Sequence, residues 1–126
     1  MSLAAQRGTR AENTAAAFLR GRGLRILARN YRVPQGEIDI IAEDAGTLTF
    51  VEVRMRSGRS HGGALESIDR RKRRRILTAA RHYLAQLPET EPPCRFDAML
   101  LMPVAEAGRE SFAVEWLRDA FNADDC

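Results

Sequence analysis

The clearest pattern in the chain is a pair of alternating apolar and polar stretches between residues 36 and 56. Segments 37–43 and 48–55 place Ile, Leu, Val or Phe at alternate positions, which predicts two β-strands. Residues 44–47 between them include the glycine and the polar side chains of a tight turn. The pattern therefore predicts a β-hairpin.

Apolar spacing outside the hairpin predicts two helices and three more strands. The helices are expected at 9–23 and 67–87, and the strands at 24–33, 94–104 and 111–117. The resulting order is α-β-β-β-α-β-β. It predicts a single α/β domain with a mixed sheet flanked by helices.

The hairpin turn decides which residues of the two strands face each other. A loop of two or four residues gives one register, with Asp39 opposite Glu52 and Glu37 opposite Arg54. A three-residue loop would shift that register by one residue. In the favoured register the other face is apolar and is expected to pack on the core: Ile38, Ile40, Ala42, Thr49, Val51 and Val53.

Two carboxylates at facing positions repel each other. In the favoured register Asp39 and Glu52 have Cβ atoms roughly 5 Å apart, and like charges so placed destabilise a sheet. Mg²⁺ is commonly bound by one or two protein carboxylates and would offset the repulsion. The alternative is a solvent-facing strand whose acids pair with Arg54 and Arg56. Spacing alone leaves both interpretations open.

The net charge of +3 conceals a basic block. Residues 54–81 contain ten Lys or Arg and two acids, a local charge of +8, so the remainder of the chain is at −5. Six basic residues are consecutive at the start of the second predicted helix: Arg70, Arg71, Lys72, Arg73, Arg74 and Arg75. Positive charge at a helix N-terminus interacts unfavourably with the helix dipole, and the neighbouring basic side chains repel one another. We therefore favour a nucleic-acid backbone as its partner, with Arg56 and Arg59 adding contacts, over a solvated helix face.

Length and composition fit one globular domain. The chain has 126 residues, 44% of them hydrophobic and 29% charged. We expect a domain at 9–122, a flexible N-terminus at 1–8 and a polar tail at 123–126. Because no apolar segment approaches a membrane span, no secretory signal opens the chain and the two cysteines are far apart, we expect a cytoplasmic protein with no membrane partner.

An ordered set of motifs gives the chain a family resemblance. GEIDIIA followed by FVEVR resembles the PD-(D/E)xK nuclease motif, in which an Asp ends one strand and Glu-x-Lys lies on the next. With AENTAAAFL, GLRILARNYR, ARHYL, CRFDAML and VEWLRDAFN, the chain is similar from Thr9 to Asn122 to the YraN-like family of predicted endonucleases. That resemblance implies a restriction-endonuclease-like fold, similarity to Holliday-junction resolvases, and Mg²⁺ or Mn²⁺ as cofactor.

The resemblance also implies roles for the acids. By position, Asp39 and Glu52 are expected to bind the metal, with the Val53 carbonyl as a third ligand. Glu12 matches an acid that resolvases add from the first helix; the alternative is a capping box between Glu12 and Thr9.

Three further side chains surround this motif. Arg54 stands where the superfamily has Lys; since Arg stays protonated, it can hold a phosphate but cannot act as a general base. Lys72, the only Lys, is a candidate replacement, although we favour its being one more residue of the basic run. Glu37 is either a supporting acid near the site or the partner of Arg54, and we favour the second.

Three functions remain open. The one we favour is a metal-dependent endonuclease acting on DNA, with branched or structured DNA as candidate substrates. The second is a nucleic-acid-binding module of the same fold that does not cleave, which Arg54 would explain. The third is an assembly factor whose basic helix meets an acidic protein. Since resolvases are commonly two-fold dimers, a homodimer is a further expectation.

Overall fold

The computed structural model describes residues 3–56, 68–88, 92–106 and 108–122. In chain order the elements are α1 (Leu3–Gly21), β1 (Arg25–Val33), β2 (Gly36–Asp44), β3 (Thr47–Met55), α3 (Arg70–Ala85), β4 (Cys94–Glu106) and β5 (Arg109–Phe121). The predicted fold class is confirmed, because the described elements follow the order α-β-β-β-α-β-β of a restriction-endonuclease-like domain. Neither described helix combines the length and apolar character that crossing a lipid bilayer requires.

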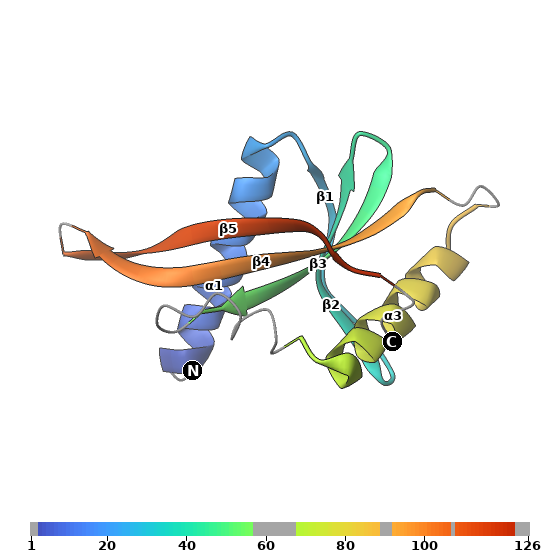
Figure 1. The fold of residues 1–126 in the computed structure, drawn as a ribbon, viewed down its shortest axis with the longest axis horizontal. Coiled ribbons are helices and arrows are strands. Elements are labelled where there is room, and N and C mark those ends of the chain that lie inside the picture. The colour runs from blue at the N-terminus through green and yellow to red at the C-terminus, as the bar shows by residue number, and fades with distance from the viewer. Residues whose placement is uncertain (1–2, 57–67, 89–91, 107, 123–126) are drawn as a thin grey trace.

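A five-stranded mixed sheet organises the domain (Figure 1). The strands lie in chain order from β1 to β5; β3 and β4 are parallel, and the other neighbours are antiparallel. A parallel pair needs a crossover connection, and α3 lies in the segment that joins β3 to β4. Figure 1 shows α1 and α3 well apart, with the β4–β5 hairpin projecting past the other strands.

The central strands β2, β3 and β4 are largely buried on both faces, and each helix covers a separate apolar core. On the α1 side the core contains Ala11, Ala15, Ala16, Leu19, Ile40, Val51 and Met99. On the α3 side it contains Ile76, Ala79, Ala80, Ile38, Ile41 and Phe50. The prediction that only one face of the hairpin packs on the core is therefore wrong, and Ile38 and Ile40, predicted on one face, belong to different cores.

The regular alternation of β2 breaks next to Asp39. Ile38 and Ile41 lie in the α3-side core although they are three positions apart, while Ile40 lies in the α1-side core. The adjacent strand β1 is irregular as well, since Asn30 has a φ of 52°. Few residues other than Gly adopt this left-handed conformation. The distortion removes Asp39 from the regular pattern of side chains.

The β2–β3 hairpin has the predicted register. Its turn consists of Ala45 and Gly46, with φ values of 49° and 92°, the combination of a type I′ turn. The facing pairs run from Asp44–Thr47 to Ile40–Val51, as a two-residue loop requires.

Two predicted boundaries are wrong. Helix α1 begins at Leu3, so Thr9 lies inside it and cannot form a capping box with Glu12. Strand β5 continues past residue 117 to Phe121, because that buried ring stacks on Phe96 and completes the α3-side core.

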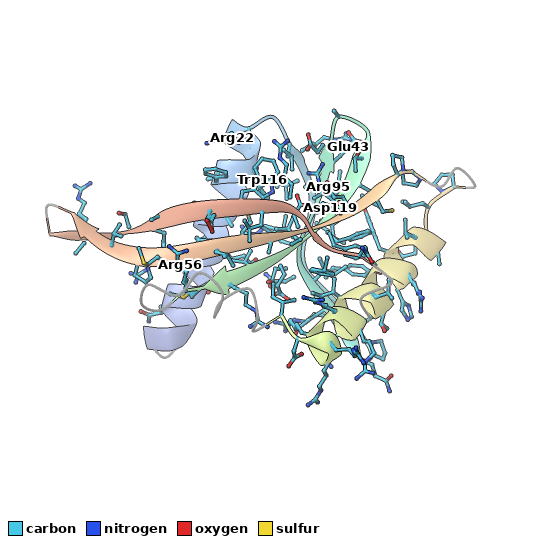
Figure 2. All side chains as sticks on the ribbon, in the orientation of Figure 1. Arg22, Glu43, Arg56, Arg95, Trp116 and Asp119 are labelled. Carbon is cyan, nitrogen blue, oxygen red and sulfur yellow. The ribbon has the colours of Figure 1, made fainter. Side chains whose placement is uncertain are left out.

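A buried carboxylate ties β4 to β5. Asp97 Oδ1 accepts from Arg95 Nε at 2.8 Å and from the Asp119 backbone N–H at 2.9 Å. Its Oδ2 accepts from Arg95 Nη2 at 3.0 Å and from Trp116 Nε1 at 2.9 Å. Figure 2 shows Trp116, Arg95 and Asp119 along one part of the sheet, with Arg56 away from them. With two donors on each oxygen, Asp97 is a structural anchor rather than a reactive group.

Gly36 allows α3 to approach the start of β2. A Cβ at this position would lie 2.7 Å from the Arg75 carbonyl oxygen and 2.9 Å from the Ala79 nitrogen, both backbone atoms. We expect Gly36→Ala to lower the free energy of unfolding by about 1–3 kcal/mol, because the helix must move away from the sheet. Guanidinium denaturation followed by circular dichroism measures this change.

Gly8→Ala is the matched control for that measurement. Gly8 lies in α1, where an added Cβ meets no atom within 4 Å. Alanine favours helix, so this variant is expected to unfold with an unchanged free energy or one raised by up to ~1 kcal/mol. A denaturation midpoint of Gly36→Ala equal to that of the parent would contradict the close approach.

Candidate functional site

The candidate site lies where β2 and β3 part. Their facing pairs end at Ile40–Val51, and residues 36–38 of β2 pair with β1. Just past the last pair, Asp39 Oδ2 accepts the backbone N–H of Val53 at 2.8 Å. A side-chain carboxylate thus satisfies an amide that a regular ladder would pair with a backbone carbonyl. This bond holds the Asp39 carboxylate at the edge of β3.

The second carboxyl, Glu52 of β3, is buried, with 5% of its surface exposed. Burial is the main cause that raises the pKa of Glu52 to about 9, followed by the hydrogen bond and the charge of Asp39; Lys72 and Arg54 act in the opposite direction. Glu52 therefore keeps its proton at neutral pH. That proton offsets the repulsion between the two carboxyl groups, which the structure brings together.

Lys72 reaches this pair from the first turn of α3. Its Nζ lies 3.1 Å from Glu37 Oε1 and 3.5 Å from Glu52 Oε2, and 19% of its side chain is exposed. Its backbone N–H donates to Asp69, the N-cap of the helix, at 2.9 Å. Lys72 is thus fixed at both its backbone and its ammonium group. We favoured the interpretation of Lys72 as one more residue of the basic run. The direction of its side chain contradicts this interpretation, because the ammonium group points to the carboxyl groups of Glu37 and Glu52.

Glu37 holds the Lys72 ammonium in place. Their hydrogen bond is the largest influence on Glu37 and lowers its pKa against the opposing effect of burial. Arg75 and Arg32 lie farther away, at 3.8 and 3.9 Å. The favoured pairing of Glu37 with Arg54 is wrong, because the ion pairs of Glu37 among the described residues are with Lys72, Arg75 and Arg32.

Glu12 of α1 lines the same cleft as Asp39. Its Oε1 accepts from Arg29 Nη2 at 3.1 Å and from Asn30 Nδ2 at 2.8 Å, so it is engaged with two donors of β1. Within the described part of the chain, no three His, Cys, Asp or Glu side chains are grouped closely enough to hold a metal ion. The structure therefore pairs Asp39 with Glu52 and leaves Glu12 outside the pair.

The basic run divides into inward and outward side chains. Arg73 Nε donates to the Ile68 carbonyl at 2.9 Å, and its guanidinium lies 5.4 Å from the centroid of the Phe121 ring. Arg75 is directed to Glu37. Three residues of the run are exposed: Arg70, Arg71 and Arg74.

Further arginines occur at the end of β3. Arg54 is half-buried and close enough to Glu52 for its charge to lower the Glu52 pKa. Arg56 Nη1 lies 3.8 Å from Glu115 Oε1 of β5. Arg59 lies outside the described residues.

Two features of the site were undervalued or missed in the sequence. Lys72 is a single Lys among 20 basic residues, and that isolation was the feature of the sequence that set it apart from the basic run. Arg29 and Asn30 interrupt the apolar pattern of β1, and Asn is depleted in strands. Nothing in the spacing of these residues indicated that they meet Glu12 of the preceding helix, α1.

Comparisons with known proteins identify one family. The model of "Uncharacterised protein family UPF0102" matches residues 11–101. The UPF0102 protein of Nitrosospira multiformis is 50% identical over 118 residues, which cover 94% of each chain. That of Nitrosomonas europaea is 47% identical over 122 residues, covering 97% of this chain and 98% of its own. That of Cupriavidus taiwanensis is 52% identical over 120 residues, covering 94% of this chain and 84% of its own.

The buried Glu52 predicts a loss of stability as pH rises. In the unfolded chain this group ionises near 4.5, whereas the folded protein keeps the proton to about pH 9. Between these values the folded state binds more protons, so the free energy of unfolding falls with increasing pH. Glu52→Gln stays neutral, and we expect it to raise the melting temperature in EDTA by roughly 5 °C at pH 8 and little at pH 5.

Glu43→Gln serves as the control for this effect. Glu43 lies on β2 in an exposed ion pair with Arg25 at 3.1 Å, and exposed pairs contribute little. Its replacement is expected to change the melting temperature by a small and equal amount at both pH values. An equal effect of Glu52→Gln at pH 5 and pH 8 would contradict the protonated state of Glu52.

Proposed function

We propose that this chain, which belongs to the uncharacterised protein family UPF0102, is a metal-dependent phosphodiesterase that cleaves nucleic acid, with DNA as its substrate. The observation that carries the proposal is the Asp39–Glu52 pair, in which a protonated Glu52 lies beside the Lys72 ammonium. Buried groups with strongly shifted pKa values occur preferentially at functional sites. The PD-(D/E)xK resemblance of the two strands supports the same reaction.

The residues present fit a hard divalent cation. Asp39 and Glu52 offer two carboxylates, the number that Mg²⁺ commonly takes from a protein while it keeps water and phosphate oxygens as its other ligands. The raised pKa of Glu52 supports this fit, because a nearby cation would favour the ionised form that the protein environment alone opposes. When bound, Mg²⁺ or Mn²⁺ would neutralise charge at the phosphate and lower the pKa of the attacking water.

We propose that Lys72 replaces the Lys of the Glu-x-Lys motif, whose position on β3 is occupied by Arg54. Hydrolysis adds a water oxygen to phosphorus and breaks one P–O ester bond, whose oxygen leaves with a proton, so negative charge grows on the phosphoryl oxygens. An ammonium fixed by Glu37 and 3.5 Å from Glu52 is placed to stabilise that charge. Arg54 supports the phosphate but cannot accept the water proton.

Binding without cleavage is the second candidate function. Arg54 favours it, because the general base that a motif Lys would provide is absent from β3. Both candidates use the exposed Arg70, Arg71 and Arg74 to contact the phosphate backbone. They differ in whether the Asp39–Glu52 pair is needed for a chemical step.

A cleavage assay separates these two functions. Supercoiled, single-stranded, flapped and four-way-junction DNA are incubated with the protein in Mg²⁺, Mn²⁺ or EDTA. We expect cleavage with metal only, and a decrease of about 100-fold or more in Asp39→Asn, Glu52→Gln and Lys72→Met. The first two remove a carboxylate that would hold the metal ion, and the third removes the ammonium that would stabilise charge on the phosphoryl oxygens. Arg54→Lys, which restores the motif, is expected to retain the parent rate or exceed it.

Glu43→Gln is the matched control in the assay. It removes a carboxylate from the same strand as Asp39 without touching the pair, so the rate is expected to stay within a factor of about two. Cleavage that persists in EDTA or in Asp39→Asn would contradict the proposal. DNA binding with no cleavage under any condition would favour the second candidate.

The outward arginines predict a salt-dependent affinity. We expect the triple variant Arg70→Gln, Arg71→Gln, Arg74→Gln to bind DNA more weakly, with the slope of log affinity against log salt reduced by about 0.9 for each phosphate that is no longer neutralised. The control replaces three exposed arginines near the end of α1, namely Arg20, Arg22 and Arg25, with Gln. Equal slopes for both triple variants in fluorescence anisotropy would argue against α3 as the DNA-binding surface.

A further inference from the structure

A cleft of about 440 Å³ opens beside Asp39, between the first half of α1 and strands β1–β3. This volume lies within the range of ~300–1,000 Å³ that small-molecule sites occupy. Asp39 belongs to its lining and is hydrogen-bonded to Val53, so the cleft is continuous with the candidate metal site. A group bound here would lie next to the phosphate that the carboxylate pair handles.

Two apolar side chains of β3, Val53 and Met55, line the cleft. Met55 is 37% exposed, and among the described residues only Leu27 is another exposed large hydrophobic side chain. Flexible Met side chains adapt to flat apolar ligands. Met55 at the end of β3 can therefore contact an apolar part of a ligand. A strand position that faces only solvent would usually carry a polar residue.

The β1 side chains that line the cleft are cationic or carry an amide: Arg29, Asn30 and Arg32. Arg29 and Asn30 are oriented by Glu12, which accepts hydrogen bonds from both. Arg32 lies farther along the same strand, is largely exposed, and has Glu37 at 3.9 Å. Guanidinium groups bind phosphates, and their planes also stack on bases; an amide can bond to base edges. Apolar side chains of β3 beside cationic and amide side chains of β1 match a nucleotide. Its sugar and base would contact Val53 and Met55, and its phosphate and polar base edges would contact the β1 side chains.

We propose that this cleft binds one unpaired nucleotide of the substrate, adjacent to the scissile phosphate. The inference rests on the proposed phosphodiesterase function and specifies its substrate class. A base within a duplex stays in the stack and cannot enter a cleft of this size unless it leaves its partner, which costs a few kcal/mol and costs least where the strand is already unpaired. The preferred substrate is therefore nucleic acid with a single-stranded flank, such as a flap or gap, and intact duplex is disfavoured.

The test uses the full-length ¹⁵N-labelled protein in EDTA, so that neither a metal ion nor cleavage is involved. Deoxyadenosine monophosphate, deoxyribose 5-phosphate and inorganic phosphate are titrated separately. We expect the amide signals of Asn30, Arg32 and Met55 to shift with the mononucleotide. Its affinity is expected to be about tenfold higher than that of inorganic phosphate, equivalent to ~1.4 kcal/mol.

Two pairs of variants make the test specific. Met55→Ser is expected to weaken mononucleotide binding about tenfold and leave phosphate binding unchanged, whereas Arg32→Gln weakens both. Leu27→Ser, at 38% exposure, and Arg25→Gln, an exposed arginine elsewhere on β1, are the matched controls and should change neither.

The outcomes test nucleotide binding in the cleft separately from the proposed cleavage reaction. Equal affinity for mononucleotide and phosphate overturns the inference in favour of an anion site only. Shifts confined to other surfaces, or no shifts up to the solubility limit of the mononucleotide, also overturn it. Mononucleotide binding in the cleft of a protein that cleaves no DNA supports the cleft and contradicts the proposed function. Cleavage of DNA without mononucleotide binding in the cleft supports the proposed function and contradicts the role of the cleft.

Discussion

A buried carboxyl group beside a second carboxylate is the constraint around which this structure is arranged. Glu52 is 5% exposed and lies next to Asp39, and neither burial nor proximity favours two negative charges. The fold relieves the conflict by keeping a proton on Glu52, by binding the Asp39 carboxylate to the Val53 amide, and by bringing the Lys72 ammonium to 3.5 Å. In the function that we propose, a divalent cation takes the place of that proton between the two carboxylates.

The irregular meeting of β2 and β3 links this pair to both faces of the sheet. Because the ladder stops at Ile40–Val51, Asp39 lines a cleft that α1 shares, while Glu52 meets Lys72 of α3. The close contact at Gly36 brings α3 against β2, next to the Glu37 that fixes Lys72. A regular hairpin would have bonded the Val53 amide to a backbone carbonyl and left the Asp39 carboxylate without this contact. The local departure from regular structure thus assembles the candidate site.

The sequence predicted what depends on local spacing and failed where distant segments meet. The Ala45-Gly46 turn sets the register of the hairpin, and that register follows from alternation and turn chemistry. The two-core arrangement does not follow, because a strand covered on both faces cannot be recognised from the alternation of a single strand. Glu37 was assigned to Arg54 on the assumption of a continuous ladder, while its real partner, Lys72, lies on a helix after a long connection. The hairpin register and the resemblance both indicated Asp39 and Glu52, and Lys72 was a candidate replacement for the motif Lys. The three-dimensional arrangement was needed to place its ammonium 3.5 Å from Glu52.

The most direct test is calorimetric titration of Mn²⁺ into the protein at pH 7, repeated in two buffers with different ionisation enthalpies. We expect one Mn²⁺ to bind per chain and to displace close to one proton, since Glu52 must ionise to become a ligand. Glu52→Gln should bind more weakly and release no proton, and Glu43→Gln should behave like the parent. Mn²⁺ binding without proton release, or with the same proton release in Glu52→Gln, would contradict the claim that the Asp39–Glu52 pair is the metal site.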